Sequence, residues 1–350
     1  MQVRPSFSSD YMEGALPEIL KRLEETNFEQ TPGYGFDVYS DSAKEKIRVA
    51  CSAPNADVYF LVGGTQTNAT VIDALIAKYE GVIAADTGHV SLHEAGAIEA
   101  AGHKVLTIAH KNGKIVAEDL VNYLNRFSAD ENRDHMVQPG MVYISQPTEY
   151  GTLYSLSELE AISKICRAKG LPLYLDGARL AYALGCPAND VTLSHIARLC
   201  DAFYIGGTKC GALFGEAVVF PNPKVVSHFF TTVKQHGALL AKGRLLGIQF
   251  DTFFSNNLYF EVGKKAVQEA DKIRKALLDN GFGLYIDSPT NQVFTVLDAK
   301  TKQLLEKKVD FGFWETLDES RTVVRFATSW ATKEENVEYL CKVLREAKQG

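Results

Sequence analysis

The chain has 350 residues, of which 46% are hydrophobic and 23% are charged. This is ordinary globular composition, and the length predicts one large domain with a smaller one. The net charge of −6 argues against nucleic acid or an anionic membrane surface as a partner. No run of 18 apolar residues predicts a membrane-spanning helix, and the N-terminus lacks the apolar segment of a signal peptide.

Six cysteines are scattered along the chain, at positions 51, 166, 186, 200, 210 and 341. None of them form a CxxC pair, so we expect no metal site. Scattered thiols without a signal segment are typical of a reducing compartment, and we expect a cytoplasmic protein.

Strand-like and helix-like segments alternate over the first two thirds of the chain. The strand candidates are residues 57–64, 81–86, 104–109, 141–147, 171–176 and 201–207, and the helix candidates are residues 67–81, 91–102 and 155–170. Strands that alternate with helices predict an α/β fold with a mostly parallel central sheet covered by helices. The continuous apolar runs agree with this, because strands in such a sheet are buried on both sides.

The last third of the chain has a different order of elements. A helix pattern at residues 257–281, with Gly263 as a candidate break, precedes strand patterns at 292–298, 309–316 and 322–330 and a helix pattern at 333–350. This order predicts a smaller C-terminal α+β domain. We place the large domain at residues 1–250 and the small one at 251–350, joined by a long helix near residues 237–262. The N-terminal segment is a candidate to pack on the small domain.

Polar residues follow several predicted strands, at the edge where open α/β sheets bind ligands. The segment VGGTQTNAT (residues 62–70) joins a strand to a helix, and its glycines with Thr65 and Gln66 suit a phosphate group at a helix N-terminus. It contains neither GxGxxG nor GxxxxGKS/T, which disfavours a dinucleotide or a P-loop nucleotide. Taken by itself, the segment is better explained as a glycine-rich turn with a capped helix.

A carboxylate and an amine end two of the most apolar strands. Asp176 closes the strand at 171–176, and either a protonated ring nitrogen or an internal pair with Arg179 would offset its burial. Lys209 follows two glycines and Thr208. A partly desolvated lysine there can form a Schiff base, although most lysines are simply solvated. A phosphate cradle, an acid and a lysine at strand ends together indicate a pyridoxal phosphate site.

Seven segments, in this order and spacing, make the chain resemble the threonine aldolase and β-eliminating lyase family of fold type I pyridoxal phosphate enzymes. They are FSSDYMEGALPEIL, YGFDVYSDSAKEKI, GGTQTN, ADTGHVSLHEAGAIE, LDGARL, GGTKCGALFGEAVVF and VVRFATSWATKEENVE. The resemblance runs nearly end to end. It implies the fold type I transferase-like fold, pyridoxal 5′-phosphate as cofactor, and a homodimer or homotetramer with sites between subunits. Tyr34 or the segment 234–247 would then reach the neighbouring subunit's site.

The resemblance also implies roles for matching residues. Lys209 would bind the cofactor covalently, Asp176 would keep its ring nitrogen protonated, and His89 would stack on the ring. Further residues would hold the cofactor, chiefly at its phosphate: Gly64, Thr65, Gln66, Arg179 and Thr208. The substrate carboxylate would lie against Ser9, Arg179 and Arg325, which suits the planar fork of arginine.

One segment departs from the family pattern. Family aldolases commonly carry Asn-Thr-His after the strand that here runs into SQPTEYGT, and this chain has no histidine there. Glu149 would replace it as the acid–base group, or it is a solvated loop residue. His93 is a further candidate, or it is simply packed one helical turn after His89.

The expected function is pyridoxal phosphate-dependent cleavage of a β-hydroxy amino acid, such as L-threonine or L-allo-threonine, to glycine and an aldehyde. The missing histidine keeps β-elimination and transamination open, because the same scaffold supports both. Two other classes have less support. One is a pyridoxal phosphate-binding protein without turnover, and the other is a Rossmann-type nucleotide protein, whose motif is absent.

Overall fold

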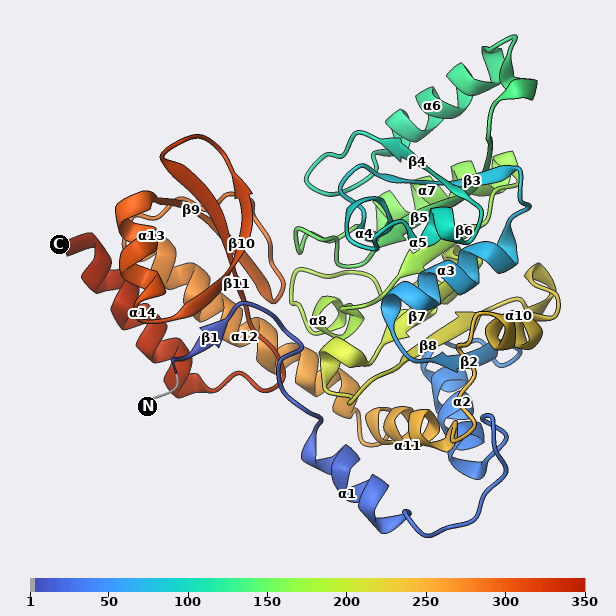
Figure 1. Ribbon diagram of the computed structural model, residues 1–350, viewed down its shortest axis with the longest axis horizontal. Helices are drawn as coiled ribbons and strands as arrows, with labels where there is room; N and C mark the ends of the chain where they lie inside the picture. The colour runs from blue at the N-terminus through green and yellow to red at the C-terminus, as the bar shows by residue number, and fades with distance from the viewer. Residues whose placement is uncertain (1–3, 350) are drawn as a thin grey trace.

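A computed structural model describes residues 4–349 and divides into a large and a small part (Figure 1). The large part is built on a seven-stranded sheet with strand order β2-β8-β7-β6-β5-β3-β4. The strands are β2 (Asp57–Leu61), β3 (Glu80–Ala85), β4 (Lys104–Ile108), β5 (Gln138–Ser145), β6 (Leu173–Asp176), β7 (Ala202–Gly206) and β8 (Glu216–Phe220). Strand β8 pairs antiparallel with β2 and with β7, and the other pairings in this sheet are parallel. The prediction of a mostly parallel central sheet is therefore confirmed.

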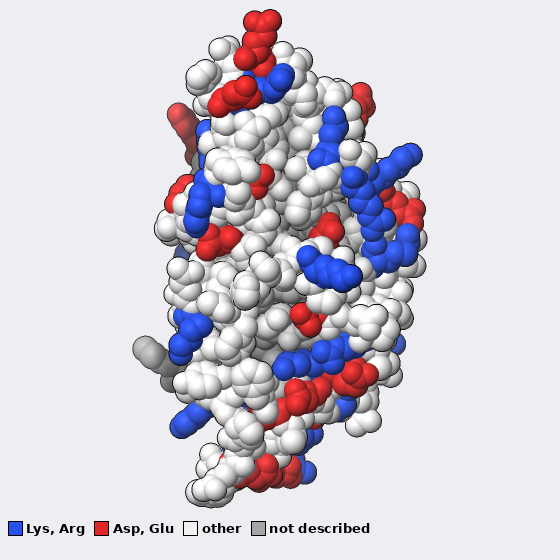
Figure 2. Space-filling view, turned by 90° about the vertical axis from the view of Figure 1, so that its right-hand side faces the viewer, with Lys and Arg blue, Asp and Glu red and all other residues white. Residues whose placement is uncertain are grey.

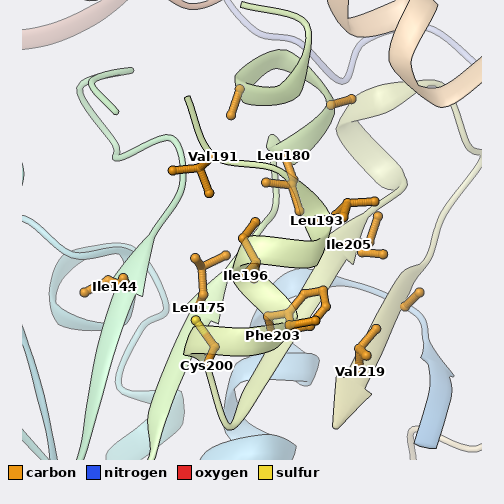
Figure 3. Close-up of a cluster of buried hydrophobic side chains, with 14 of the residues drawn as sticks. Ile144, Leu175, Leu180, Val191, Leu193, Ile196, Cys200, Phe203, Ile205 and Val219 are labelled. Carbon is orange, nitrogen blue, oxygen red and sulfur yellow. The ribbon is translucent and has the colours of Figure 1, made fainter. Parts of the chain in front are cut away.

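Helices cover both faces of this sheet (Figure 1). They are α1 (Pro17–Glu25), α2 (Val38–Ala50), α3 (Gly64–Leu75), α4 (His89–Leu92), α5 (Ala97–Ala100), α6 (Ala117–Ala129), α7 (Leu156–Lys169), α8 (Leu180–Leu184), α9 (Leu193–Leu199), α10 (Phe229–Gln235) and α11 (Arg244–Phe253). On one face, Leu175 and Phe203 of the sheet pack with Leu193 and Ile196 of α9 (Figure 3). A second apolar cluster, which includes Val71 of α3, covers the other face. Apolar side chains on both sides of the strands explain why the strands read as continuous apolar runs.

The small part has a four-stranded sheet with strand order β1-β10-β11-β9. Its strands are β1 (Ser6–Phe7), β9 (Gln292–Asp298), β10 (Asp310–Thr316) and β11 (Arg321–Ala327), and its helices are α12 (Leu258–Asp279), α13 (Ala299–Glu306) and α14 (Glu334–Gln349). Strand β1 pairs in parallel with β10, with Ser6 opposite Asp310. The N-terminal segment therefore packs on the small part, whereas α2, later in the chain, packs on the large part (Figure 1).

Two helix predictions are wrong in detail. Residues 237–262 do not form one long helix, because α11 ends at Phe253 and the left-handed residues Asn256 and Asn257 separate it from α12. Helix α12 continues through Gly263 without a break. A side chain at Gly263 would lie 1.9 Å from the Ala181 carbonyl oxygen of α8, so glycine lets the two helices touch.

The helix expected at residues 91–102 is also divided. It forms two short helices, α4 and α5, with Gly96 between them at a φ of 75°. This break leaves His89 at the start of its own short turn beside the sheet. In contrast, the prediction at 155–170 is confirmed by the capping box of Ser155 and Glu158 and by Gly170 at the C-terminus of α7. No helix among the described residues is long and apolar enough to cross a membrane.

Candidate active site

A cavity of about 880 Å³ opens at the carboxyl ends of the central strands. Its walls come from both parts of the molecule, because β6 and the loop after β7 supply Asp176 and Lys209, and β10 and β11 supply Trp314 and Arg325. This is the edge at which the sequence predicted a ligand site.

Lys209 lies in the short turn between β7 and β8, at the floor of the cavity. Close packing requires glycine at position 207, two residues before Lys209, because a side chain there would lie 2.7 Å from the Gly215 carbonyl oxygen. Burial lowers the pKa of the Lys209 amine, and the nearby charge of Arg179 lowers it further. A half-buried lysine that gives up its proton readily is suited to act as a nucleophile.

Asp176 ends β6 and faces the same cavity. Its carboxylate accepts hydrogen bonds from Tyr143 Oη (2.7 Å), Asn68 Nδ2 (3.0 Å), the Ala178 amide (2.9 Å) and Tyr204 Oη (2.5 Å). Burial raises the pKa of Asp176, but the charge of His89 and these hydrogen bonds outweigh it and leave the pKa lowered. Asp176 is therefore a fixed carboxylate, and its pairing with Arg179, considered from the sequence, is absent.

The N-terminus of α3 forms another wall of the cavity through Gly64 and Thr65. The N-cap residue is Gly63, which has no side chain to bond the first amides of the helix. Thr208 joins this wall from the Lys209 turn. The Gln66 side chain is turned away, because its Oε1 accepts from the Val62 amide at 3.4 Å.

Arg179 lines the cavity, but two of its nitrogens are engaged by a carboxylate that sequence reasoning missed. Its Nε and Nη2 donate to Asp10 at 2.6 and 2.9 Å, in a bidentate pair. Asn291 Nδ2 donates to the same carboxylate at 3.0 Å. Burial raises the pKa of Asp10, yet the charge and hydrogen bonds of Arg179 bring it down to about 2. Asp10 thereby fixes the plane of the Arg179 guanidinium.

Arg325 and Ser9 keep polar atoms that no protein group satisfies. Arg325 donates from Nη1 to Gln292 Oε1 (2.9 Å) and from Nη2 to the Ser8 carbonyl (2.8 Å). Its Nε is buried without a partner, and so is Ser9 Oγ. Buried donors without partners are costly. Arg325 lines the cavity, so its guanidinium is a group there that suits an anionic ligand.

Glu149 is buried at the cavity wall and is not a solvated loop residue. Its Oε1 accepts from the His89 amide (2.9 Å) and from Ser145 Oγ (2.7 Å). Burial raises the pKa of Glu149, which brings the carboxyl closer to the pH at which it can exchange a proton.

His89 and His93 both line the cavity, with ring centroids 5.7 Å apart. His89 Nδ1 lies 2.7 Å from Glu94 Oε1, a partner that sequence reasoning missed. His93 is exposed, and its ring centroid lies 6.4 Å from that of Trp314. Partial desolvation of the ring lowers the pKa of His93.

The cavity collects most of the predicted site residues. They are Gly64, Thr65, His89, Glu149, Asp176, Arg179, Thr208, Lys209 and Arg325. Gln66 and Ser9 lie beside it without lining it. The residues that sequence reasoning missed are Asp10, Asn68, Glu94, Tyr204, Glu216 and Trp314. Glu216 carried a readable signal, since it is a lone carboxyl opening an apolar strand, just as Asp176 closes one.

No metal centre was found among residues 4–349, where no cluster of three or more histidine, cysteine, aspartate or glutamate side chains has a suitable arrangement. The six cysteines are free thiols, and five of them are buried.

The chain has the fold type I transferase-like fold. A solved aspartate aminotransferase from Thermus thermophilus superimposes with a TM-score of 0.70 at 15% identity, over 98% of this chain and 91% of the other. Such a likeness concerns the fold alone.

The family is defined by closer matches. The profile of the beta-eliminating lyase family matches residues 6–296, so the chain belongs to this family. A low specificity L-threonine aldolase from a Pseudomonas species is 31% identical over 97% of this chain and 96% of its own length. A solved threonine aldolase from Leishmania major is 42% identical, with a TM-score of 0.95 over 98% of this chain and 99% of that chain.

Proposed function

We propose that the protein is a pyridoxal phosphate-dependent lyase of the threonine aldolase type, which cleaves a β-hydroxy amino acid to glycine and an aldehyde. The observation that carries the proposal is the pairing, in one cavity, of a half-buried Lys209 whose pKa is lowered with an Asp176 held as a carboxylate. The threonine aldolases from Pseudomonas and Leishmania named above support the reaction type.

The residues present fit the cofactor. Lys209 would hold its aldehyde carbon, Asp176 its ring nitrogen, and the first amides of α3 with Thr65 and Thr208 its phosphate. When bound, pyridoxal phosphate supplies an electron sink for the pair released when the Cα–Cβ bond breaks. Asp176 accepts four hydrogen bonds and stays ionised, so it can keep a cationic nitrogen protonated beside it.

The substrate carboxylate would bind beside Arg179 and Arg325, which both line the cavity. Arg325 Nε and Ser9 Oγ are buried and unsatisfied, and Arg179 stands beside them, held by Asp10. A carboxylate bound there would satisfy both orphan donors and fix the Cα–Cβ bond in one orientation. Orientation selects which bond is cleaved, because the bond perpendicular to the electron sink gains most from it.

Glu149 takes the place of the missing family histidine as the acid–base group. Its Oε1 is occupied by the His89 amide and Ser145, which leaves Oε2 as the oxygen that would take the proton of the substrate's β-hydroxyl. The raised pKa of the buried carboxyl favours its holding that proton until the aldehyde has formed.

The test is release of aldehyde and glycine from cofactor-loaded protein with L-threonine, L-allo-threonine and phenylserine. Equal amounts of both products establish the aldolase. If amino acids change the cofactor's absorbance and no aldehyde forms, the protein breaks a different bond, and β-elimination or transamination replaces the proposal. If no amino acid is consumed at all, the protein is a pyridoxal phosphate-binding protein without turnover.

We also infer a cytoplasmic homo-oligomer. The buried free thiols suit a reducing compartment. Large apolar side chains near α2 are exposed, namely Phe28 at 95%, Val38 at 69% and Phe36 at 62%. On the face that Figure 2 shows, acidic and basic residues are interspersed and leave uncharged surface between them. Light scattering on the purified protein tests the oligomer, and a monomer at micromolar concentration contradicts it.

A further inference from the structure

A buried carboxyl group, Glu94, lies behind His89 and has no role in the chemistry described so far. Its Oε1 lies 2.7 Å from His89 Nδ1 and also accepts from Asn68 Nδ2 at 2.7 Å. Its Oε2 is buried without a partner. A carboxylate so placed is costly unless the groups around it supply compensating protons or charge. Burial raises the pKa of Glu94, against the lowering effect of its bonds to His89 and Asn68.

Asn68 joins this carboxyl to the one that faces the cofactor. Its amide nitrogen donates both to Glu94 Oε1 (2.7 Å) and to Asp176 Oδ2 (3.0 Å). Its Oδ1 accepts from Tyr174 Oη at 2.9 Å. This last bond fixes the orientation of the amide, because a flipped amide would turn its oxygen toward two carboxyl groups. Asn68 is fully buried on α3 and is therefore a rigid bridge between Asp176 of β6 and Glu94 in the segment between α4 and α5.

We propose that Glu94 and Asn68 are positioning residues that hold His89 with a proton on Nδ1 and with Nε2 turned to the cavity. The histidine ring is thereby fixed relative to Asp176, the residue that would bind the ring nitrogen of the cofactor. The proton on Nδ1 follows from geometry, since Glu94 Oε1 already accepts from Asn68 and lies at hydrogen-bond distance from His89 Nδ1. A carboxylate behind a histidine sets the tautomer in this way in other enzymes.

The backbone of His89 adds a second restraint. Its amide donates to Glu149 Oε1, so the proposed acid–base group and the histidine share one hydrogen bond at the start of α4. Ser145 Oγ donates to Glu149 Oε1 at 2.7 Å and lies 3.3 Å from Tyr143 Oη, which donates to Asp176. Polar contacts thus extend from His89 toward Asp176 on two sides, through Glu94 and Asn68 and through Glu149 and Ser145. A change at Glu94 should therefore alter how the site acts on bound substrate more than how tightly it binds substrate.

The role of His89 in catalysis rests on the proposed function. The protonation of its ring at Nδ1 does not depend on that function. The first measurement is ¹⁵N NMR of histidine-labelled wild-type protein, with and without cofactor, with the His89 signals assigned by His89→Asn. We expect Nδ1 to carry a proton in both forms. A signal showing Nε2–H with unprotonated Nδ1 would overturn the inference, whatever the activity of the protein.

The second measurement uses Glu94→Gln, which keeps the shape and removes the carboxylate. We expect kcat to fall about 10- to 100-fold with KM changed less than about threefold, and His89 to show a mixture of tautomers. An unchanged tautomer or an unchanged kcat contradicts the proposal. Absence of aldehyde from wild type would remove the proposed function and leave the NMR result to decide this inference.

A matched control is Asp73→Asn. Asp73 lies 3.1 Å from buried His103 Nε2 and also pairs with His236 and Lys78, all outside the cavity, so Asp73→Asn breaks histidine–carboxyl pairs away from the site. We expect this variant to keep kcat and the His89 signals of wild type. A loss of kcat equal to that of Glu94→Gln would mean that breaking any buried histidine–carboxyl pair damages the protein, and the proposal would fail.

Discussion

The floor and the rim of the cavity are built in different ways. The floor consists of residues at the ends of neighbouring strands of one sheet, such as Asp176 and Lys209. The rim joins residues that are far apart, since Asp10 and Arg179 are separated by 169 positions, and Ser8 and Arg325 by 317. The floor is thus complete within the large part. The rim forms only where the N-terminal segment, the large part and the small part meet, so the two should fail differently when mutated.

The largest effect is expected at the floor. Lys209→Ala removes the amine that would hold the cofactor, and activity should fall by more than about 10³-fold. The visible absorbance of the bound cofactor should disappear while the circular dichroism of the fold stays. Lys224→Ala, at an exposed lysine in the segment that follows β8, is the control. Retained cofactor absorbance in Lys209→Ala would remove Lys209 from the role assigned to it.

The second expected effect concerns Glu149. Glu149→Gln keeps the hydrogen-bonding shape but takes no proton, so kcat should fall about 10²-fold or more. Because the pKa of Glu149 is raised, the wild-type kcat should increase with pH above the ordinary range of a glutamate, as the carboxylate forms. The variant should lack this increase. A wild-type pH profile retained in Glu149→Gln would assign the proton transfer to another group.

At the rim, Asp10→Asn breaks the bidentate pair with Arg179 and leaves the guanidinium free to turn. We expect kcat/KM to fall about 10- to 100-fold, mainly through KM, since charge-assisted hydrogen bonds of this kind contribute about 1.5–3 kcal/mol. Asp251→Asn is the matched control, because Asp251 is paired with Arg22 and Lys46 away from the cavity. Equal losses of kcat/KM in both variants would indicate general destabilisation and would erase the distinction between floor and rim.

The smallest effect on activity, and a clear one on stability, is expected at Glu216. Burial raises the pKa of this carboxyl to about 8 in the folded protein, from an ordinary value of 4.5. The folded state therefore holds the proton more tightly than the unfolded state, and this contribution to stability is lost as pH rises from about 4.5 to about 8. The free energy of unfolding of Glu216→Gln, measured in urea on the cofactor-free protein, should therefore exceed that of wild type by more at pH 8.5 than at pH 5.

The control for this measurement is Glu338→Gln on the exposed side of α14. Its stability relative to wild type should be the same at both pH values. If the difference between Glu216→Gln and wild type is also the same at both, Glu216 ionises as an ordinary surface carboxyl does, and the floor is more hydrated than its burial indicates.

The contrast between floor and rim also explains which site residues could be predicted from the sequence. Asp176 and Lys209 each interrupt an apolar run, so the order of strands was enough to place them at one edge of the sheet. Asp10 gave no such signal, since its partner Arg179 is set by the docking of the N-terminal segment. The burial of Glu149 was equally hidden, because it depends on α4 packing over the loop after β5. The role of Gly263 was misjudged because helix contact, rather than helix propensity, decides it.

The pairing of β1 with β10 has a consequence for the order in which the molecule is assembled during synthesis. Strand β1 cannot pair until β10, more than 300 positions later, has been synthesised, because Ser6 lies opposite Asp310. The large sheet, which ends at Phe220, has all its strands long before that point. A growing chain therefore acquires Lys209 and its surroundings early, while Ser9 and Asp10 reach their places only when synthesis is nearly finished. The rim completes the site last, so a nascent or truncated chain would hold the floor of the site without the means to orient a substrate.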